Sequence, residues 1–189
     1  VSDSAIDSVD RAQGRERAAV VPVHFLPCLL GVGQLLIGDA HRDAGRTAEA
    51  VHAYERVIPL RPPDAYEPNW LIADTLDRAG DKAAGAAYFE ACLAVARRRD
   101  NPFLAGHNLS RLGRTDEAAA AFRAAIARNP DAYPPYISLF DMLAEEGNAE
   151  ALVRVFAEVA EEQGEHAFGY FLLGRAHREM ENTEAAREA

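Results

Sequence analysis

Apolar side chains recur at helical spacing along most of the chain, and turn signals interrupt them at nearly constant intervals. The turn glycines are Gly45, Gly80, Gly113 and Gly147, which recur at steps of about 34 residues. Each follows about four turns of helical pattern, where a helix end favours a residue that tolerates positive φ. A residue expected to cap the next helix follows each glycine: Thr47, Asp81, Thr115 and Asn148. The pattern predicts helix, tight turn and helix, repeated.

Two segments of the chain nearly copy themselves. Gly45–Ala50 recurs as Gly113–Ala118, and Pro63–Pro68 recurs as Pro130–Pro135. Both offsets are close to two periods of about 34 residues, a length that is typical of helical-hairpin arrays. The near-copies therefore indicate an array in which units two periods apart are the most similar to each other.

The repeat resembles the tetratricopeptide repeat family, which has small residues late in its first helix and early in its second, an aromatic four positions later and a closing proline. Three units fit: Gly38, Ala50, Tyr54 and Pro62; Ala73, Gly85 and Phe89; Gly106, Ala118, Phe122 and Pro130. Arg97 replaces the second proline, and the fourth unit has Phe140, Leu152 and Phe156. Small residues let two helices approach closely, and we expect the aromatic rings to fill the gap toward the next hairpin. The bulky residues predict a departure in the fourth unit.

The resemblance implies an all-α fold, a right-handed superhelix of antiparallel helix pairs, over residues 28–189. The expected units are 31–64, 66–98, 99–132, 133–166 and a partial fifth unit, 167–189, that ends inside its second helix. Residues 1–27 do not align and are expected to form a tail or an irregular helix. Stacked arrays usually end in a polar capping helix, so we expect a piece of a longer protein.

In this family the first helix of each unit lines a concave groove. Its fifth position forms a predicted apolar ladder: Leu35, Trp70, Phe103, Ile137 and Phe171. One turn further along lies a mainly acidic rail: Asp39, Asp74, His107, Asp141 and Arg175. The ladder is predicted to bind a partner, with Trp70 as the strongest anchor, because Ile37, Ile72, Leu139 and Leu173 already supply core positions. The opposing interpretation is that the ladder itself is core between units.

Such a groove suits a protein or peptide that combines apolar anchors with Lys or Arg. The family's carboxylate clamp is absent, because Leu35, Asp39, Glu67 and Leu71 occupy the corresponding places. Two alternatives stay open. One is a non-catalytic arm that recruits substrates for a larger enzyme, as in related glycosyltransferases and sulfotransferases. The other is self-association, with a homodimer formed through the terminal hairpin.

The net charge of the chain limits which classes of partner it is expected to bind. The chain carries −10, and residues 133–189 hold 12 acidic against 4 basic side chains. This balance disfavours nucleic acid and anionic membranes and favours a basic partner. The two cysteines, Cys28 and Cys92, do not make a disulfide framework, so we expect a reducing compartment, the cytoplasm, with the periplasm as the alternative.

No residue pattern indicates catalysis, a metal or a cofactor. His41 and His177 share a position that is normally a core aromatic, His52 is expected to be solvated, and no histidine pair has zinc-site spacing. A nucleophile with a neighbouring base is missing, and no glycine-rich phosphate loop follows a strand. Arg97–Arg99 close a helix, where cations complement its dipole. We therefore expect no enzyme.

Overall fold

The computed structural model describes residues 26–60, 66–145, 147, 149–163 and 167–188, and these contain α-helices, one short 3-10 helix and no strand. The helices and their bounds are α2 (Leu26–Asp43), α3 (Thr47–Glu55), η2 (Ile58–Leu60), α4 (Glu67–Arg78), α5 (Lys82–Arg98), α6 (Pro102–Arg111), α7 (Thr115–Arg128), α8 (Tyr133–Glu145), α9 (Ala149–Gln163) and α10 (Ala167–Glu188). The tail expected for residues 1–27 lies almost wholly outside the described residues.

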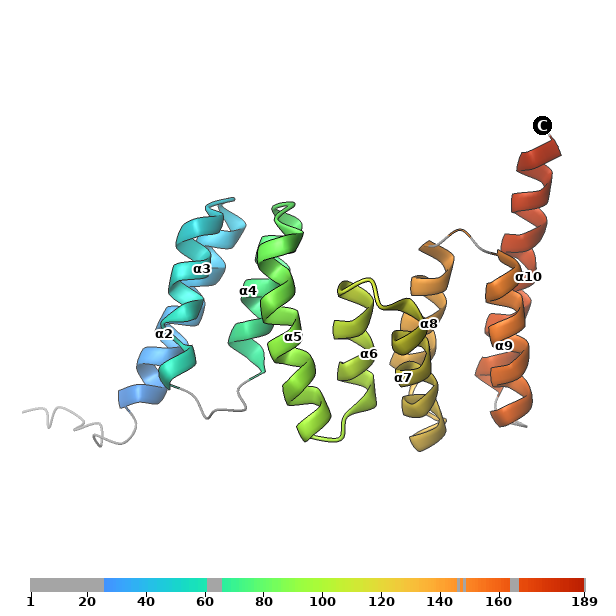
Figure 1. Cartoon of the computed structure of the whole chain (residues 1–189), viewed down its shortest axis with the longest axis horizontal. Helices are drawn as coiled ribbons and strands as arrows, with labels where there is room; N and C mark the ends of the chain where they lie inside the picture. The colour runs from blue at the N-terminus through green and yellow to red at the C-terminus, as the bar shows by residue number, and fades with distance from the viewer. Residues whose placement is uncertain (1–25, 61–65, 146, 148, 164–166, 189) are drawn as a thin grey trace, which may run out of the picture.

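The helices form an elongated row that follows the order of the chain (Figure 1). They group as a first pair (α2/α3), a second (α4/α5), a third (α6/α7) and a fourth (α8/α9), followed by α10. Each of the first three pairs also packs against the next helix in the chain. No pair can bury its apolar face alone, so stacking supplies the core. The described chain is an all-α solenoid of antiparallel helix pairs, as the sequence predicts.

The turns inside the pairs use the expected glycines. Gly45, Gly80, Gly113 and Gly147 have φ between 68° and 87°. At the first turn, the Gly45 N–H donates to the Arg42 carbonyl and the Arg46 N–H donates to the His41 carbonyl, both at 2.9 Å. This is the hydrogen-bond pattern that closes a helix through a left-handed residue.

In two pairs, the predicted N-cap residue lies one position after the observed N-cap. The N-cap is the residue directly after the glycine, so Thr47 and Thr115 are the first helical residues and do not cap. Arg46 and Arg114 occupy the N-cap positions, and neither side chain makes a cap hydrogen bond. Asp81 caps α5 as predicted, accepting from the Ala84 N–H at 3.1 Å. Asn148 lies outside the described residues.

Glycines let helices of the first and third pairs approach closely. A Cβ atom at Gly38 would overlap the Tyr54 ring, and one at Gly106 would lie 2.7 Å from the Phe122 ring. Both rings are buried, at 0% and 1% exposure. Each ring therefore packs on the glycine of its own pair. The Phe89 ring of the second pair also reaches the next pair, as expected, because the Arg111 guanidinium lies 5.6 Å from its centroid.

The fourth pair packs differently, as its bulky residues predict. Phe140 occupies the position of the two glycines, and its ring centroid lies 5.5 Å from that of Phe156. Helices α8 and α9 make far fewer close backbone contacts than the helices of the other pairs, whereas α9 and α10 pack closely. A Cβ atom at Gly169 would lie 3.3 Å from the Ala160 Cα. The close helix approach thus moves from α8/α9 to α9/α10.

The expected partial fifth hairpin is wrong. Helix α10 runs without a break from Ala167 to Glu188. One further period of about 34 residues after Gly147 would place the turn glycine at Glu181, a residue that favours a continuing helix. The described residues therefore do not contain the second helix of the expected fifth hairpin, because α10 is continuous.

Most expected core positions are buried, with one exception. Ile72 and Leu139 are fully buried, and Leu173 is partly buried against the main core cluster. Ile37 is 46% exposed, so its core assignment is wrong. It lies on α2, whose outer face has no helix before it in the described chain. Leu29 and Leu36 are also exposed there, at 55% and 64%.

Candidate functional site

A polar cleft of about 360 Å³ opens between the first helices of successive pairs. Helices α4, α6 and α8, the first turn of α5 and one ring from α7 contribute its walls. The lining residues are Asp77, Lys82, His107, Ser110, Arg111, Phe122, Ser138, Asp141, Met142 and Glu145. We call this cavity the polar cleft.

Helical spacing explains why these side chains meet. On α6, His107 and Ser110 are one turn apart on one face, and Ser138, Asp141 and Glu145 share a face of α8. A hydrogen bond joins Ser138 Oγ and His107 Nε2 at 3.2 Å, which links the two helices across the cleft. The cleft thus brings together two predicted rail residues, His107 and Asp141.

The charges on the two walls differ. Arg111 pairs with Asp77 and lies 3.6 Å from an Asp74 oxygen, so two carboxylates already balance it. On the α8 wall, Asp141 and Glu145 are exposed, and neither has an ion-pair partner among the described residues. Lys82 is the remaining cation of the lining. The cleft keeps an excess of negative charge, concentrated on α8.

Burial and a neighbouring cation favour the neutral form of His107. Desolvation lowers the pKa of His107, and the positive charge of Arg111 lowers the pKa further. The imidazole packs edge-on against Phe103, with centroids 4.6 Å apart, and against Phe122 at 5.4 Å. The ring is therefore both a polar lining group and part of an aromatic cluster.

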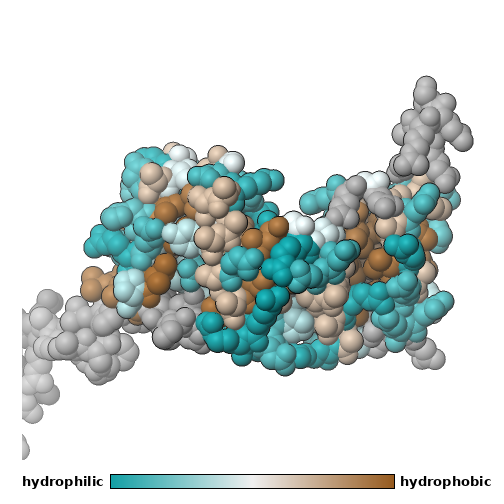
Figure 2. Space-filling model, in the orientation of Figure 1, coloured by the Kyte–Doolittle hydropathy of each residue, from teal (hydrophilic) through white to brown (hydrophobic). Residues whose placement is uncertain are grey.

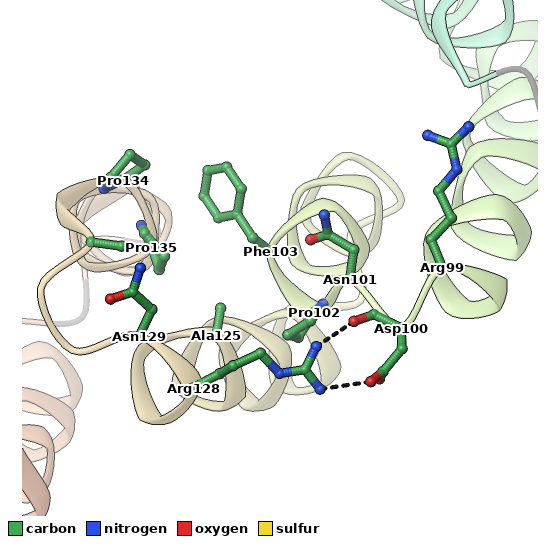
Figure 3. A pocket seen from close by; sticks show the side chains of 11 residues that line it. Arg99, Asp100, Asn101, Pro102, Phe103, Ala125, Arg128, Asn129, Pro134 and Pro135 are labelled. Atoms are coloured by element: carbon green, nitrogen blue, oxygen red, sulfur yellow. Dashed lines mark hydrogen bonds and ion pairs between the residues drawn. The ribbon is translucent and has the colours of Figure 1, made fainter.

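A second cavity, of about 390 Å³, lies where α6 and α8 begin. We call it the proline pocket, because its residues are Arg99, Asp100, Asn101, Pro102, Phe103, Ala125, Arg128, Asn129, Ala132, Pro134 and Pro135. Figure 3 shows Phe103 and the prolines facing one another, with Arg128 bridged to Asp100 at the rim. The Arg128–Asp100 contact is 2.8 Å, so this cation is already paired. The pocket offers a mainly apolar interior.

The predicted ladder divides into packed and exposed members. Leu35, Phe103 and Ile137 are partly buried and pack against the core clusters. Trp70 is half-buried. Phe171 is 58% exposed and stacks on Phe168 with centroids 5.8 Å apart. Phe103 also lines the proline pocket, so one ladder residue borders a cavity.

Most of the predicted rail is engaged within the chain. Asp39 accepts a hydrogen bond from the Tyr54 hydroxyl at 2.7 Å and pairs with Arg42 at 3.1 Å. Asp74 is 7% exposed and pairs with Arg78 at 2.8 Å. The Arg175 guanidinium lies 4.4 Å above the Phe140 ring. Of the predicted carboxylates, Asp141 is the one most available to a ligand.

Sequence reasoning missed several groups of the polar cleft. Ser110 and Glu145 lie one helical turn beyond the predicted His107 and Asp141, and Asp77 follows Asp74 by three residues. Extending the rail by one further turn would have found all three. Ser138 has no such signal, because its position depends on how α8 is rotated against α6.

The remaining histidines, the cysteine and the arginines discussed in the sequence analysis either have a structural role or have no role that the structure indicates. His177 is exposed, which corrects its core assignment, and His41 is half-buried and accepts from Arg46 at 2.9 Å. His52 is exposed as expected. Cys92 is buried, and burial raises the pKa of its thiol to about 12. Arg97 and Arg98 form the last turn of α5, as predicted.

Neither a metal-binding cluster nor a membrane-spanning helix occurs among the described residues. No cluster of three His, Cys, Asp or Glu side chains there has a geometry suited to a metal ion. None of the described helices combines the length and the apolar character that crossing a membrane requires. The face in view in Figure 2 is largely hydrophilic, with separate hydrophobic patches.

No curated protein sequence matches the chain. Among solved structures, a crystal structure of MamA protein aligns at 16% identity, covering 84% of this chain and 92% of that one, with a TM-score of 0.49. A second MamA structure, of AMB-1, aligns at 18% identity over 81% and 90%, with a TM-score of 0.47. A family model for the tetratricopeptide repeat matches residues 35–102 and 103–133, more than half of the sequence, and the chain belongs to this family.

Proposed function

We propose that this protein holds a partner segment rich in apolar and basic residues along the inner row formed by α4, α6 and α8. A tetratricopeptide array is in general a scaffold for protein interactions. The finer assignment rests mainly on one observation, the polar cleft whose α8 wall carries Asp141 and Glu145 without partners among the described residues.

Charge and shape both support this partner class. A cationic side chain gains from two exposed carboxylates that lie one turn apart and repel each other in its absence. Phe122 and Met142 line the same cleft and offer apolar contact to the stem of Lys or Arg. Exposed Phe171 adds an apolar anchor further along the array.

Selection from a phage-displayed random peptide library tests the proposal. The purified chain should enrich peptides that combine Leu, Ile or aromatic residues with Lys or Arg. Enrichment of acidic peptides, or no enrichment over the naked support, would contradict it.

Two aromatic variants then test whether the ladder face takes part. Phe171→Ala should weaken the selected peptides, because this ring occupies the ladder position. Tyr170→Ala is the matched control, since Tyr170 is its neighbour with similar exposure, 52% against 58%. Equal effects of the two variants would remove Phe171 from the binding face.

A further inference from the structure

The polar cleft and the proline pocket both border α6 and α8, and we call the two cavities together the α6/α8 site. Phe103 lines the pocket and His107 lines the cleft, and their rings are in edge contact at 4.6 Å. On the other side, Pro134 lines the pocket and Asp141 lines the cleft. Helices α6 and α8 run parallel, because each is antiparallel to α7 between them. The two cavities are thus consecutive along the same pair of helices.

The distance between the cavities sets a spacing for any ligand that fills both. Pro134 and Asp141 are seven residues apart on one face of α8, which corresponds to about 10 Å along the helix axis. In an extended peptide, three residues span about 10 Å. Side chains i and i+3 of a β-strand point to opposite faces, but a polyproline II segment has three residues per turn and rises about 3.1 Å per residue. A segment in the polyproline II conformation therefore places side chains i and i+3 on one side, over the two cavities.

The chemistry of the cavities differs and so specifies the two side chains. The proline pocket has an apolar interior, and its rim cation Arg128 is held by Asp100. The polar cleft has three carboxylates against two cations in its lining. An apolar side chain suits the first cavity and a cationic side chain suits the second.

We propose that the two cavities of the α6/α8 site bind two side chains of one polyproline II segment as a two-residue code: an apolar residue in the proline pocket and Lys or Arg, three positions away, in the polar cleft. This inference rests on the proposed function and adds a spacing to it. The α6/α8 site fixes the register of the partner, and the rest of the inner row contributes affinity.

Short synthetic peptides test the spacing directly. Each peptide carries one Leu and one Lys in a Ser/Gly background, with separations from one to six residues and in both orders. Binding to the isotope-labelled full chain is measured by chemical-shift changes in NMR titration, which detects weak complexes. The tightest binding is expected at a separation of three. A flat dependence on separation, or no shift at the cleft residues, overturns the inference.

Charge-neutralising variants test the assignment of the cleft. With Asp141→Asn and Glu145→Gln combined, the preference for Lys over an isosteric neutral residue should fall about fivefold. The matched control combines Asp116→Asn with Glu161→Gln, which removes the same charge from exposed residues outside both cavities. Equal loss in both variants means general charge attraction and overturns the cleft assignment.

The experiments distinguish a failure of the two-residue code from a failure of the proposed function. If library selection enriches basic and apolar peptides that depend on Phe171 while the spacing series is flat, the two-residue code is wrong and the groove function stands. If selection enriches acidic peptides, the proposed function is wrong, and a peak at three in the synthetic series would then reflect an isolated site.

Discussion

The third and fourth helix pairs show two solutions to the same packing problem. In the third pair, Gly106 lets the Phe122 ring lie directly on α6, and the helices pack closely. In the fourth pair, Phe140 takes the glycine position, and its ring meets Phe156 instead. Helices α8 and α9 separate, and α9 pairs with α10 through Gly169 and Ala160 (Figure 1).

The difference shows that one side chain per pair decides which helices approach most closely. A glycine on the first helix has no Cβ to collide with the aromatic ring of the second helix. A phenylalanine at the same position instead fills the space between the helices from the first helix. Both solutions bury the aromatic ring, since Phe122 and Phe156 are exposed by 1% or less. The solenoid therefore tolerates either arrangement, but the residues of each are not interchangeable.

Phe140→Ala should cause the largest loss of stability. The ring is 1% exposed, and removing it from a packed core costs about 3–5 kcal/mol of unfolding free energy. Chemical denaturation with circular dichroism measures this. A loss far below that range would mean that α8 and α9 close onto the smaller residue as the other pairs do, and the comparison would fail.

Gly106→Ala should destabilise by about 1–3 kcal/mol, because the new Cβ would overlap the buried Phe122 ring. Gly174→Ala is the control, since no atom lies within 4 Å of its Cβ position and α10 continues through it. That control should gain about 0.5–1 kcal/mol from helix propensity. Denaturation midpoints that change equally in both variants would contradict the glycine argument.

Tyr54→Phe should cost about 1–2 kcal/mol, because it removes the hydrogen bond that the buried hydroxyl donates to Asp39 at 2.7 Å. The first pair would then have the same ring as the third pair. Tyr88 is partly buried, but its 2.9 Å hydrogen bond to Glu55 is exposed to solvent, so Tyr88→Phe should cost less. Thermal melts of the two variants side by side would show whether burial sets the difference.

His107 should give the smallest effect, a pH dependence of stability. Burial and Arg111 lower its pKa in the folded chain below the ordinary value of 6.5, so the unfolded chain binds the proton more readily. This contribution is fully present above pH 6.5 and is lost as the pH falls from 6.5 through the folded-state pKa. Melting temperatures of the wild type and His107→Gln should diverge across that window. Parallel curves would rule out this histidine as the source.

The sequence was enough for the architecture, because its signals are local. The turn glycines and the glycine–aromatic pairs lie within single hairpins, and all of them occupy the expected places. The end of the array was predicted wrongly. A family period predicts a turn near Glu181, but this chain has no glycine there and the helix continues.

The candidate site was only partly predictable. Helical spacing predicted that His107 and Asp141 lie on the ladder face of their helices, and both line the polar cleft. It did not show that Asp74 would be buried against Arg78 and Arg111. An ion pair such as Asp74–Arg111 joins neighbouring pairs, so it depends on how the helices are rotated against one another, which no local pattern encodes.

The most direct test of the inner-row account is NMR mapping of a library-selected peptide on the isotope-labelled chain. The account predicts chemical-shift changes concentrated on α6 and α8 around His107 and Asp141, extending to α4. Changes concentrated on the second helices, α5, α7 and α9, would contradict it.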